Sequence, residues 1–98
     1  MSLRHARSGK ERRQVRAALH AERPAFQVGK GGVDAAIVGA IDQALTAREA
    51  LKIRVGPACP LEPAATAEAL AVELRAEVIS VTGRTLILYR PNPDETGH

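Results

Sequence analysis

The sequence has very few aromatic residues, with one phenylalanine, one tyrosine and no tryptophan among 98 residues. A core without aromatic rings must be built mainly from alanine, valine, isoleucine and leucine. RNA-binding domains of the RRM and OB-fold types stack bases on exposed aromatic side chains. The near absence of aromatics therefore argues against both of these architectures.

The sequence also lacks the cysteines and long apolar runs of secreted or membrane proteins. Cys59 is the only cysteine, which excludes a disulfide within the chain. No segment approaches the ~20 apolar residues of a membrane span, and no apolar segment follows the basic N-terminus as in a signal peptide. We therefore expect a cytoplasmic protein with no membrane partner.

Candidate groups for catalysis or metal binding are equally scarce. His5, His20 and Cys59 do not have the spacing of metal ligands. No arrangement of serine, histidine and aspartate suggests a catalytic triad. We expect no catalytic residue, no metal, no cofactor, no small-molecule substrate and no enzyme activity.

Positive charge is present, but it is concentrated in the first third of the chain. Residues 1–32 contain eight Lys or Arg and two Glu, whereas residues 33–98 contain six basic and nine acidic side chains. A localised basic surface suits a phosphate-rich partner. A solvated arm and helix face is an equally good interpretation of the charge alone.

Hydrophobic periodicity predicts three helices and four strands in a single domain that spans residues 1–98. Ser8 and Glu11 form a capping box at the start of a helix, in which Val15, Ala18 and Leu19 form an apolar stripe. The basic side chains of this helix lie largely off that stripe. The expected helices are residues 9–21, 33–47 and 62–74, and the expected strands are residues 25–28, 50–55, 78–82 and 85–89.

The order of these elements, α-β-α-β-α-β-β, predicts an α/β fold with two layers. The first strand-helix-strand unit favours parallel pairing of its strands. Gly83-Arg84 forms a two-residue turn between the last two strands, which makes them an antiparallel hairpin. We expect a mixed four-stranded sheet with helices packed on it, a loose N-terminal arm at residues 1–7 and a loose tail at residues 91–98.

Gly29-Lys30-Gly31-Gly32 lies between the first expected strand and the second expected helix. Such a turn exposes backbone N–H groups beside the positive end of the helix dipole, and both features favour phosphate. Lys30 adds a full positive charge, and Asp34 is expected in the first turn of the helix. A plain tight turn between strand and helix is the alternative interpretation.

Three nucleotide-binding motifs can be compared with this loop. A Walker loop fails because Lys30 is followed by glycine, and a dinucleotide fingerprint fails because position 34 is aspartate. A G-x-x-G clamp, which KH modules use on backbone nucleotides, fits Gly29 and Gly32. The basic surroundings favour the clamp over the plain turn.

Four segments together resemble one known family, the YhbY/CRM-domain RNA-binding proteins. The segments are GKERR at 9–13, FQVGKGG at 26–32, IDQAL at 41–45 and VTGRTLILYR at 81–90. The resemblance covers roughly residues 8–91. One departure is Leu74-Arg75, which stands where the family often has a glycine.

The resemblance implies a fold similar to the C-terminal domain of translation initiation factor three, and binding of RNA through the G-x-x-G loop. For stand-alone bacterial members it implies association with ribosomal RNA in precursors of the large (50S) subunit, as an assembly factor. We expect a monomer whose partner is this RNA. The candidate RNA-binding residues are Gly29, Lys30, Gly31, Gly32, Lys10, Arg12, Arg13, Arg16, Lys52, Arg54 and Arg84.

Two other functions remain open at this point. A protein–protein adaptor could use the basic face to bind an acidic protein partner. A partner that still co-purifies with the protein after RNA digestion would favour this function. A small regulator or enzyme that binds phosphorylated metabolites is the weaker alternative, which thermal shifts with nucleotides would reveal.

Overall fold

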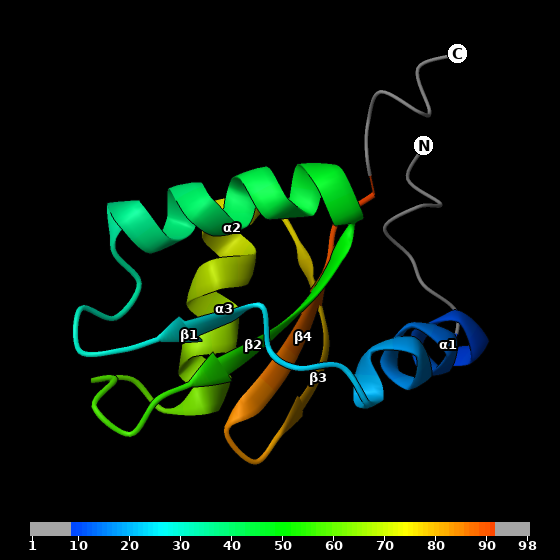
Figure 1. Cartoon of the computed structure of the whole chain (residues 1–98), viewed down its shortest axis with the longest axis horizontal. Helices are drawn as coiled ribbons and strands as arrows, with labels where there is room; N and C mark the ends of the chain where they lie inside the picture. The colour runs from blue at the N-terminus through cyan, green and yellow to red at the C-terminus, as the bar shows by residue number, and fades with distance from the viewer. Residues whose placement is uncertain (1–8, 92–98) are drawn as a thin grey trace.

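The structure is a computed structural model that describes residues 9–91. The seven expected elements are present in the expected order (Figure 1). The predicted Ser8 cap and the arm at residues 1–7 lie outside the described residues, as does the predicted tail apart from the buried Pro91. The elements are α1 (Gly9–His20), β1 (Phe26–Val28), α2 (Ala35–Arg48), β2 (Ala50–Val55), α3 (Pro63–Leu74), β3 (Glu77–Thr82) and β4 (Thr85–Tyr89).

The four strands form one mixed sheet in the order β1-β2-β4-β3. β1 pairs in parallel with β2, and β4 runs antiparallel to both β2 and β3. Thr82 pairs with Thr85 across the two-residue turn, where Gly83 has a φ of 58°. Parallel pairing of the first two strands and the terminal hairpin are therefore confirmed, and so is the mixed α/β fold.

One face of the sheet carries the main core under α2 and α3. Alternate residues of β2 and β4 point to this face, and helix residues at intervals of three or four meet them. Their side chains are aliphatic, as the scarcity of aromatics requires. The buried residues of this core are Val28, Ile41, Leu45, Leu51, Ile53, Val55, Ala67, Leu70, Leu74, Leu86 and Leu88.

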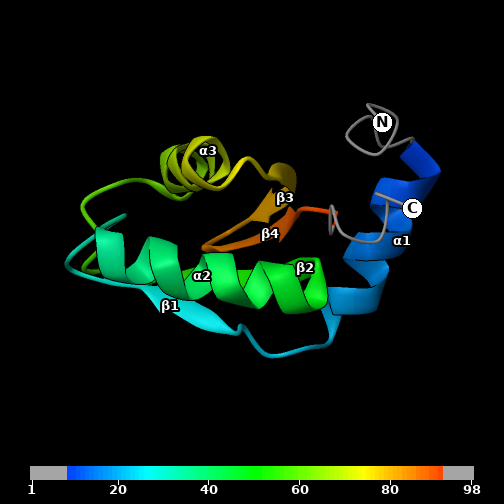
Figure 2. The same cartoon turned by 90° about the horizontal axis from the view of Figure 1, so that it is seen from above.

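α1 packs against the opposite face of the sheet. Leu19 joins Ile79 and Ile87 in a second, smaller cluster, with Val15 partly buried beside them. Ala18, which the expected stripe included, is exposed. Figure 2 shows α1 at one end of the molecule, crossing the direction of α2. Because α1 reaches only this end, much of the second face of the sheet is not covered by any helix of residues 9–91.

Two helices end on residues with a left-handed backbone. Glu49 follows α2 with a φ of 69°, and Arg75 follows α3 with a φ of 55°. In each case the N–H of this residue is bonded to a carbonyl of the last turn. Glycine is the residue that adopts this conformation at the lowest cost. The position where the family often has a glycine is thus a true left-handed helix end, filled here by arginine.

Arg90 joins the end of β4 to both helices of the main layer. Its guanidinium lies 2.7 Å from Oδ1 of Asp42 on α2 and donates to the carbonyl of Leu74 at 3.0 Å. These contacts hold the two helices together at the end of the sheet where α3 terminates.

Candidate nucleic-acid interface

The glycine loop, residues 29–32, is a tight turn closed by its own backbone. The N–H of Gly32 donates to the carbonyl of Gly29 at 2.9 Å. Gly32 is buried with a φ of +66°, and a Cβ atom there would lie 3.2 Å from Cγ of Pro60. Lys30 and Gly31 are exposed at the tip. The turn requires glycine at position 32, whereas a Cβ at Gly29 would meet nothing within 4 Å.

The start of α2 already has a carboxylate of its own. Asp34 is the N-cap residue, and its Oδ1 accepts a hydrogen bond from the N–H of Ile37 at 2.9 Å. This is a correction, because Asp34 was expected inside the first helical turn. A capping carboxylate fills part of the space at the helix end and offsets the positive end of the helix dipole, which would otherwise attract an anion. Attraction of phosphate to this loop therefore depends mainly on Lys30 and the turn backbone.

The basic side chains of α1 separate into two groups. Lys10, Arg13 and Arg16 are exposed, and none of them forms an ion pair with another side chain of residues 9–91. Arg12 instead turns towards β3, where it lies 2.7 Å from the Glu77 carboxylate and donates to the carbonyl of Val78 at 3.2 Å. Three of the four predicted cations of this helix thus face solvent, and Arg12 holds the helix on the sheet.

Lys52 and Arg84 are also used within the fold. The Nζ of Lys52 donates to the carbonyls of His20 and Glu22 at 2.7 and 3.0 Å, where α1 ends. The guanidinium of Arg84 donates to the carbonyls of Val55 and Gly56 at 2.9 and 2.8 Å. Both side chains keep their positive charge near the surface, but these hydrogen bonds go to the protein backbone.

The structure places the glycine loop and α1 at opposite ends of the molecule, whose longest dimension is 41 Å (Figure 1). The open face of the sheet lies between them. Gln27 pairs in register with Arg54, which in turn pairs with Thr85, so these three side chains lie on one face. Gln27 lines a hollow beside the glycine loop and a second hollow that it shares with Arg54.

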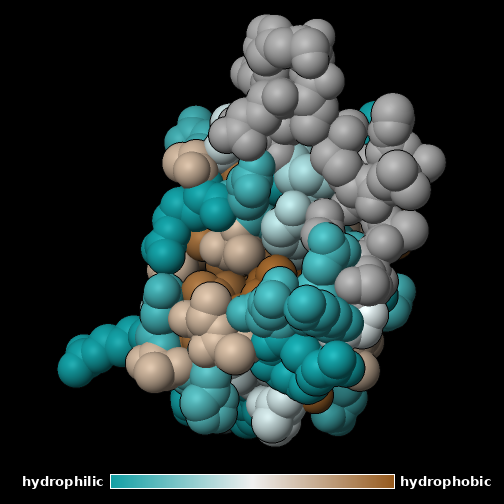
Figure 3. All heavy atoms as spheres, turned by 90° about the vertical axis from the view of Figure 1, so that its right-hand side faces the viewer, coloured by the Kyte–Doolittle hydropathy of each residue, from teal (hydrophilic) through white to brown (hydrophobic). Residues whose placement is uncertain are grey.

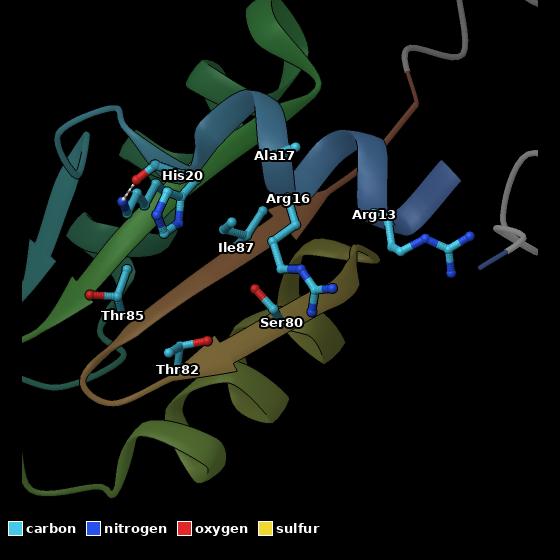
Figure 4. A pocket seen from close by; sticks show the side chains of 9 residues that line it. Arg13, Arg16, Ala17, His20, Ser80, Thr82, Thr85 and Ile87 are labelled. Atoms are coloured by element: carbon cyan, nitrogen blue, oxygen red, sulfur yellow. Dashed lines mark hydrogen bonds between the residues drawn. The ribbon is translucent and has the colours of Figure 1, made fainter. Parts of the chain in front are cut away.

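A third hollow, larger than these two, lies between α1 and the strands (Figure 4). We call it the α1 groove; its volume is about 580 Å³. Thr85, which lines this groove, pairs with Arg54 on the neighbouring strand, so the groove adjoins Arg54. No acidic residue is among the described residues that line it. They are Arg13, Arg16, Ala17, His20, Lys52, Ser80, Thr82, Thr85 and Ile87.

Sequence reasoning missed Gln27, His20 and the hydroxyl residues of this face. Ser80, Thr82 and Thr85 alternate along β3 and β4 with residues that point to the other side of the sheet. This alternation of polar side chains was the available signal. It could not be used without knowing that α1 leaves this face partly open.

The described residues contain neither a cluster of metal ligands nor a helix that could span a membrane. Within residues 9–91, no group of three or more histidine, cysteine, aspartate or glutamate side chains could hold a metal ion. No helix in this part of the chain is long and apolar enough to cross a membrane. Cys59 is half-buried, with its Sγ 3.7 Å from Oγ1 of Thr66.

The chain is similar to several known proteins over most of its length. It is 37% identical over 87 residues to the Bacillus subtilis protein named "Probable RNA-binding protein YqeI", covering 89% of this chain and 91% of that one. It is 36% identical over 86 residues to the Methanocaldococcus jannaschii protein named "Probable RNA-binding protein MJ0652", covering 86% of this chain but only 63% of the relative's length.

A solved structure shows the same fold. The solution structure of SAV1595 from Staphylococcus aureus, described as a candidate RNA-binding protein, matches with a TM-score of 0.71 at 32% identity, covering 88% of this chain and 90% of that one. Residues 8–90 match the CRS1/YhbY (CRM) domain. With nearly the whole chain inside that match, this protein belongs to the CRS1/YhbY (CRM) domain family.

Proposed function

We propose that this protein binds ribosomal RNA in precursors of the large (50S) ribosomal subunit and acts there as an assembly factor. Its family and the names of its relatives support RNA as the partner. The ribosomal part of the proposal follows from the family resemblance of the sequence. The protein acts by holding an RNA segment, without chemistry on it.

The observation that carries the proposal is the continuous open face from the glycine loop to α1. Exposed cations lie at both ends, Lys30 on the loop and Arg13 and Arg16 on the helix, and Arg54 is exposed between them. Outside the small apolar cluster under α1, this face carries the polar side chain of Gln27 and adjoining hollows. Cations spread along one polar face suit the phosphates of an RNA backbone.

The surface at the α1 end of the molecule is polar, as a nucleic-acid interface requires. Figure 3 looks at the end of the molecule that carries α1, and most of the described side chains visible there are hydrophilic. The most hydrophobic residues in this view show mainly in a recess between them, and a few weakly hydrophobic residues lie at the edges. RNA and DNA interfaces are more polar and more positively charged than those between proteins.

The experiment that tests the loop assignment is charge reversal of Lys30. Lys30→Glu should weaken binding to a fragment of large-subunit ribosomal RNA by about tenfold or more, because it replaces an attraction for phosphate with a repulsion. Arg75→Glu is the matched control, since Arg75 is exposed at the end of α3, on the side of the sheet that α2 and α3 cover. A Lys30→Glu protein that folds and binds this RNA like the parent would show that the loop is not at the RNA.

A second readout tests the ribosomal part. In cells, the parent protein should sediment with particles that contain large-subunit precursor RNA, and Lys30→Glu should shift it to the free fraction. Sedimentation of the parent with no ribosomal precursor would contradict the assembly role while leaving RNA binding itself intact.

A further inference from the structure

We propose that the α1 groove receives an unpaired nucleotide, so that this protein selects single-stranded over base-paired RNA. The inference rests on the proposed function and adds to it a site and a class of RNA. One wall of the groove, α1, lies at the end of the molecule opposite the glycine loop (Figure 1). The glycine loop would bind the RNA backbone, and the groove would accept only a nucleotide whose base is unpaired.

The size and shape of the groove suit a nucleotide. Its volume of about 580 Å³ lies within the range of small-ligand sites in proteins. It has α1 as one wall and the strands as the other, with Ala17 and Ile87 supplying apolar surface (Figure 4). A base in a duplex is stacked and paired inside the helix, so only a base that is splayed out can enter such a space.

The strand wall offers hydroxyl groups at the spacing of alternate residues. Ser80 and Thr82 lie on β3, and Thr85 lies opposite Thr82 on β4. A hydroxyl can donate and accept a hydrogen bond, so it can meet either kind of group on a base edge or a ribose 2′-OH. None of these three hydroxyls forms a hydrogen bond with another residue in the part of the chain that the structure describes, which leaves them able to bond a ligand.

The helix wall supplies positive charge. In Figure 4, the guanidinium of Arg16 extends from α1 towards Ser80, whereas that of Arg13 points away along the outer side of the helix. Lys52 adds charge at the other end of the groove, near the end of α1. A guanidinium can bind a phosphate with two parallel hydrogen bonds or lie flat on a base. Positive charge beside hydroxyls, with no acidic lining residue, is complementary to a nucleotide rather than to a basic or neutral peptide.

The test compares one RNA in two forms. An unstructured RNA of about 12 nucleotides, long enough to span a typical single-strand site, is measured alone and annealed to its complement. Binding of the full chain is followed by fluorescence anisotropy at one salt concentration. The parent should bind the single strand at least about tenfold more tightly than the duplex, since unpairing a base is unfavourable.

The variants ask whether the groove causes this preference. Ser80→Ala with Thr82→Val removes two hydroxyls while keeping side chains that fit a strand. It should weaken single-strand binding about fivefold, the effect of one or two neutral hydrogen bonds, and change duplex binding less than about twofold. Arg16→Gln should weaken single-strand binding more than Arg75→Gln, which removes a charge beside α3 on the other side of the sheet. Thr82→Val alone, at an exposed position, gives a second route if the double variant does not fold.

The outcomes separate this inference from the proposed function. Equal binding of single strand and duplex by the parent would overturn the groove proposal, as would a folded hydroxyl variant that keeps the full preference. The proposal would also be overturned if the hydroxyl variant lost as much affinity for heparin, a polyanion without bases, as it lost for the single-stranded RNA. If the parent binds neither RNA form, the proposed function itself has failed. If Lys30→Glu weakens both forms while the hydroxyl variant changes neither, RNA binding stands and the groove does not contribute.

Discussion

Arg12 on α1 lies 2.7 Å from the carboxylate of Glu77 on β3, and this ion pair joins the first helix to the edge strand of the sheet. The two residues are far apart in the sequence. The side chain of Glu77 is only 17% exposed, and its oxygens accept no aligned hydrogen bond in the described part of the structure. Arg12 is therefore the partner that makes this buried carboxylate tolerable.

Removing Arg12 should lower the stability of the fold in addition to removing one positive charge. Arg12→Ala leaves Glu77 with a desolvated charge and no partner, and we expect a loss of about 1–3 kcal/mol in the free energy of unfolding. The Arg12 side chain is 43% exposed, so solvent screening places the loss below that of a fully buried pair. Urea unfolding measures it.

The control for this prediction is the double variant. Arg12→Ala with Glu77→Gln removes both charges, and it should be more stable than Arg12→Ala alone. If the double variant is no more stable, the cost of Arg12→Ala comes from lost packing of its side chain and not from the stranded carboxylate.

The sequence predicted the elements and their order well, because their signals are local. The spacing of apolar residues four apart in α2, and the alternation of apolar and polar residues in β2, depend only on neighbours in the chain. The hairpin turn is likewise marked by its own residue, Gly83, which adopts a positive φ. The helix of residues 33–47 began two residues late in the structure, since Val33 and Asp34 precede it and Asp34 serves as its cap.

The roles of individual cations could not be predicted in the same way. Lys52, Arg84 and Arg12 bond backbone carbonyls that lie 28 to 66 residues away in the chain. Nothing in the sequence marks those carbonyls, so all three appeared as free surface charges. The α1 groove was invisible for the same reason, since it exists only where α1 meets the second face of the sheet.

Two glycines of the loop should differ in how much the same substitution lowers stability. Gly32→Ala forces a side chain into a left-handed backbone and to 3.2 Å from Pro60, so it should lower the free energy of unfolding by about 1–2 kcal/mol. Gly29→Ala should change stability by less than about 0.5 kcal/mol, because a Cβ there meets nothing within 4 Å. Thermal or urea unfolding of the two variants gives the comparison.

Gly29→Ala also tests how closely RNA approaches the loop. The variant should fold like the parent, so a weaker affinity for RNA would come from the added methyl group at the interface. Equal stability and equal RNA affinity would mean that no ligand atom comes near Gly29, and the clamp would then depend on Lys30 and Gly31 alone.

Binding of RNA should depend on salt in proportion to the phosphates contacted. Each phosphate contact on a single strand contributes about 0.7 to the slope of log affinity against log salt concentration. Lys30→Ala and Arg54→Ala should each lower this slope by about that amount, since both side chains are exposed on the proposed path. Arg75→Gln should leave it unchanged. An unchanged slope for Lys30→Ala would remove the loop from the path.

Arg75 offers a stabilising substitution, because it occupies a left-handed backbone at φ 55° and ψ 44° where α3 ends. Arg75→Gly should raise the free energy of unfolding by about 0.5–1 kcal/mol, since relief of the strain on the backbone exceeds the added entropy of glycine in the unfolded chain. Urea unfolding measures the gain. Arg75→Ala is the matched control, as it removes the same charge and keeps a Cβ atom in the strained conformation. A gain of equal size in Arg75→Ala would assign the effect to charge, whereas a gain confined to Arg75→Gly would show that arginine stands at a helix end whose geometry favours glycine.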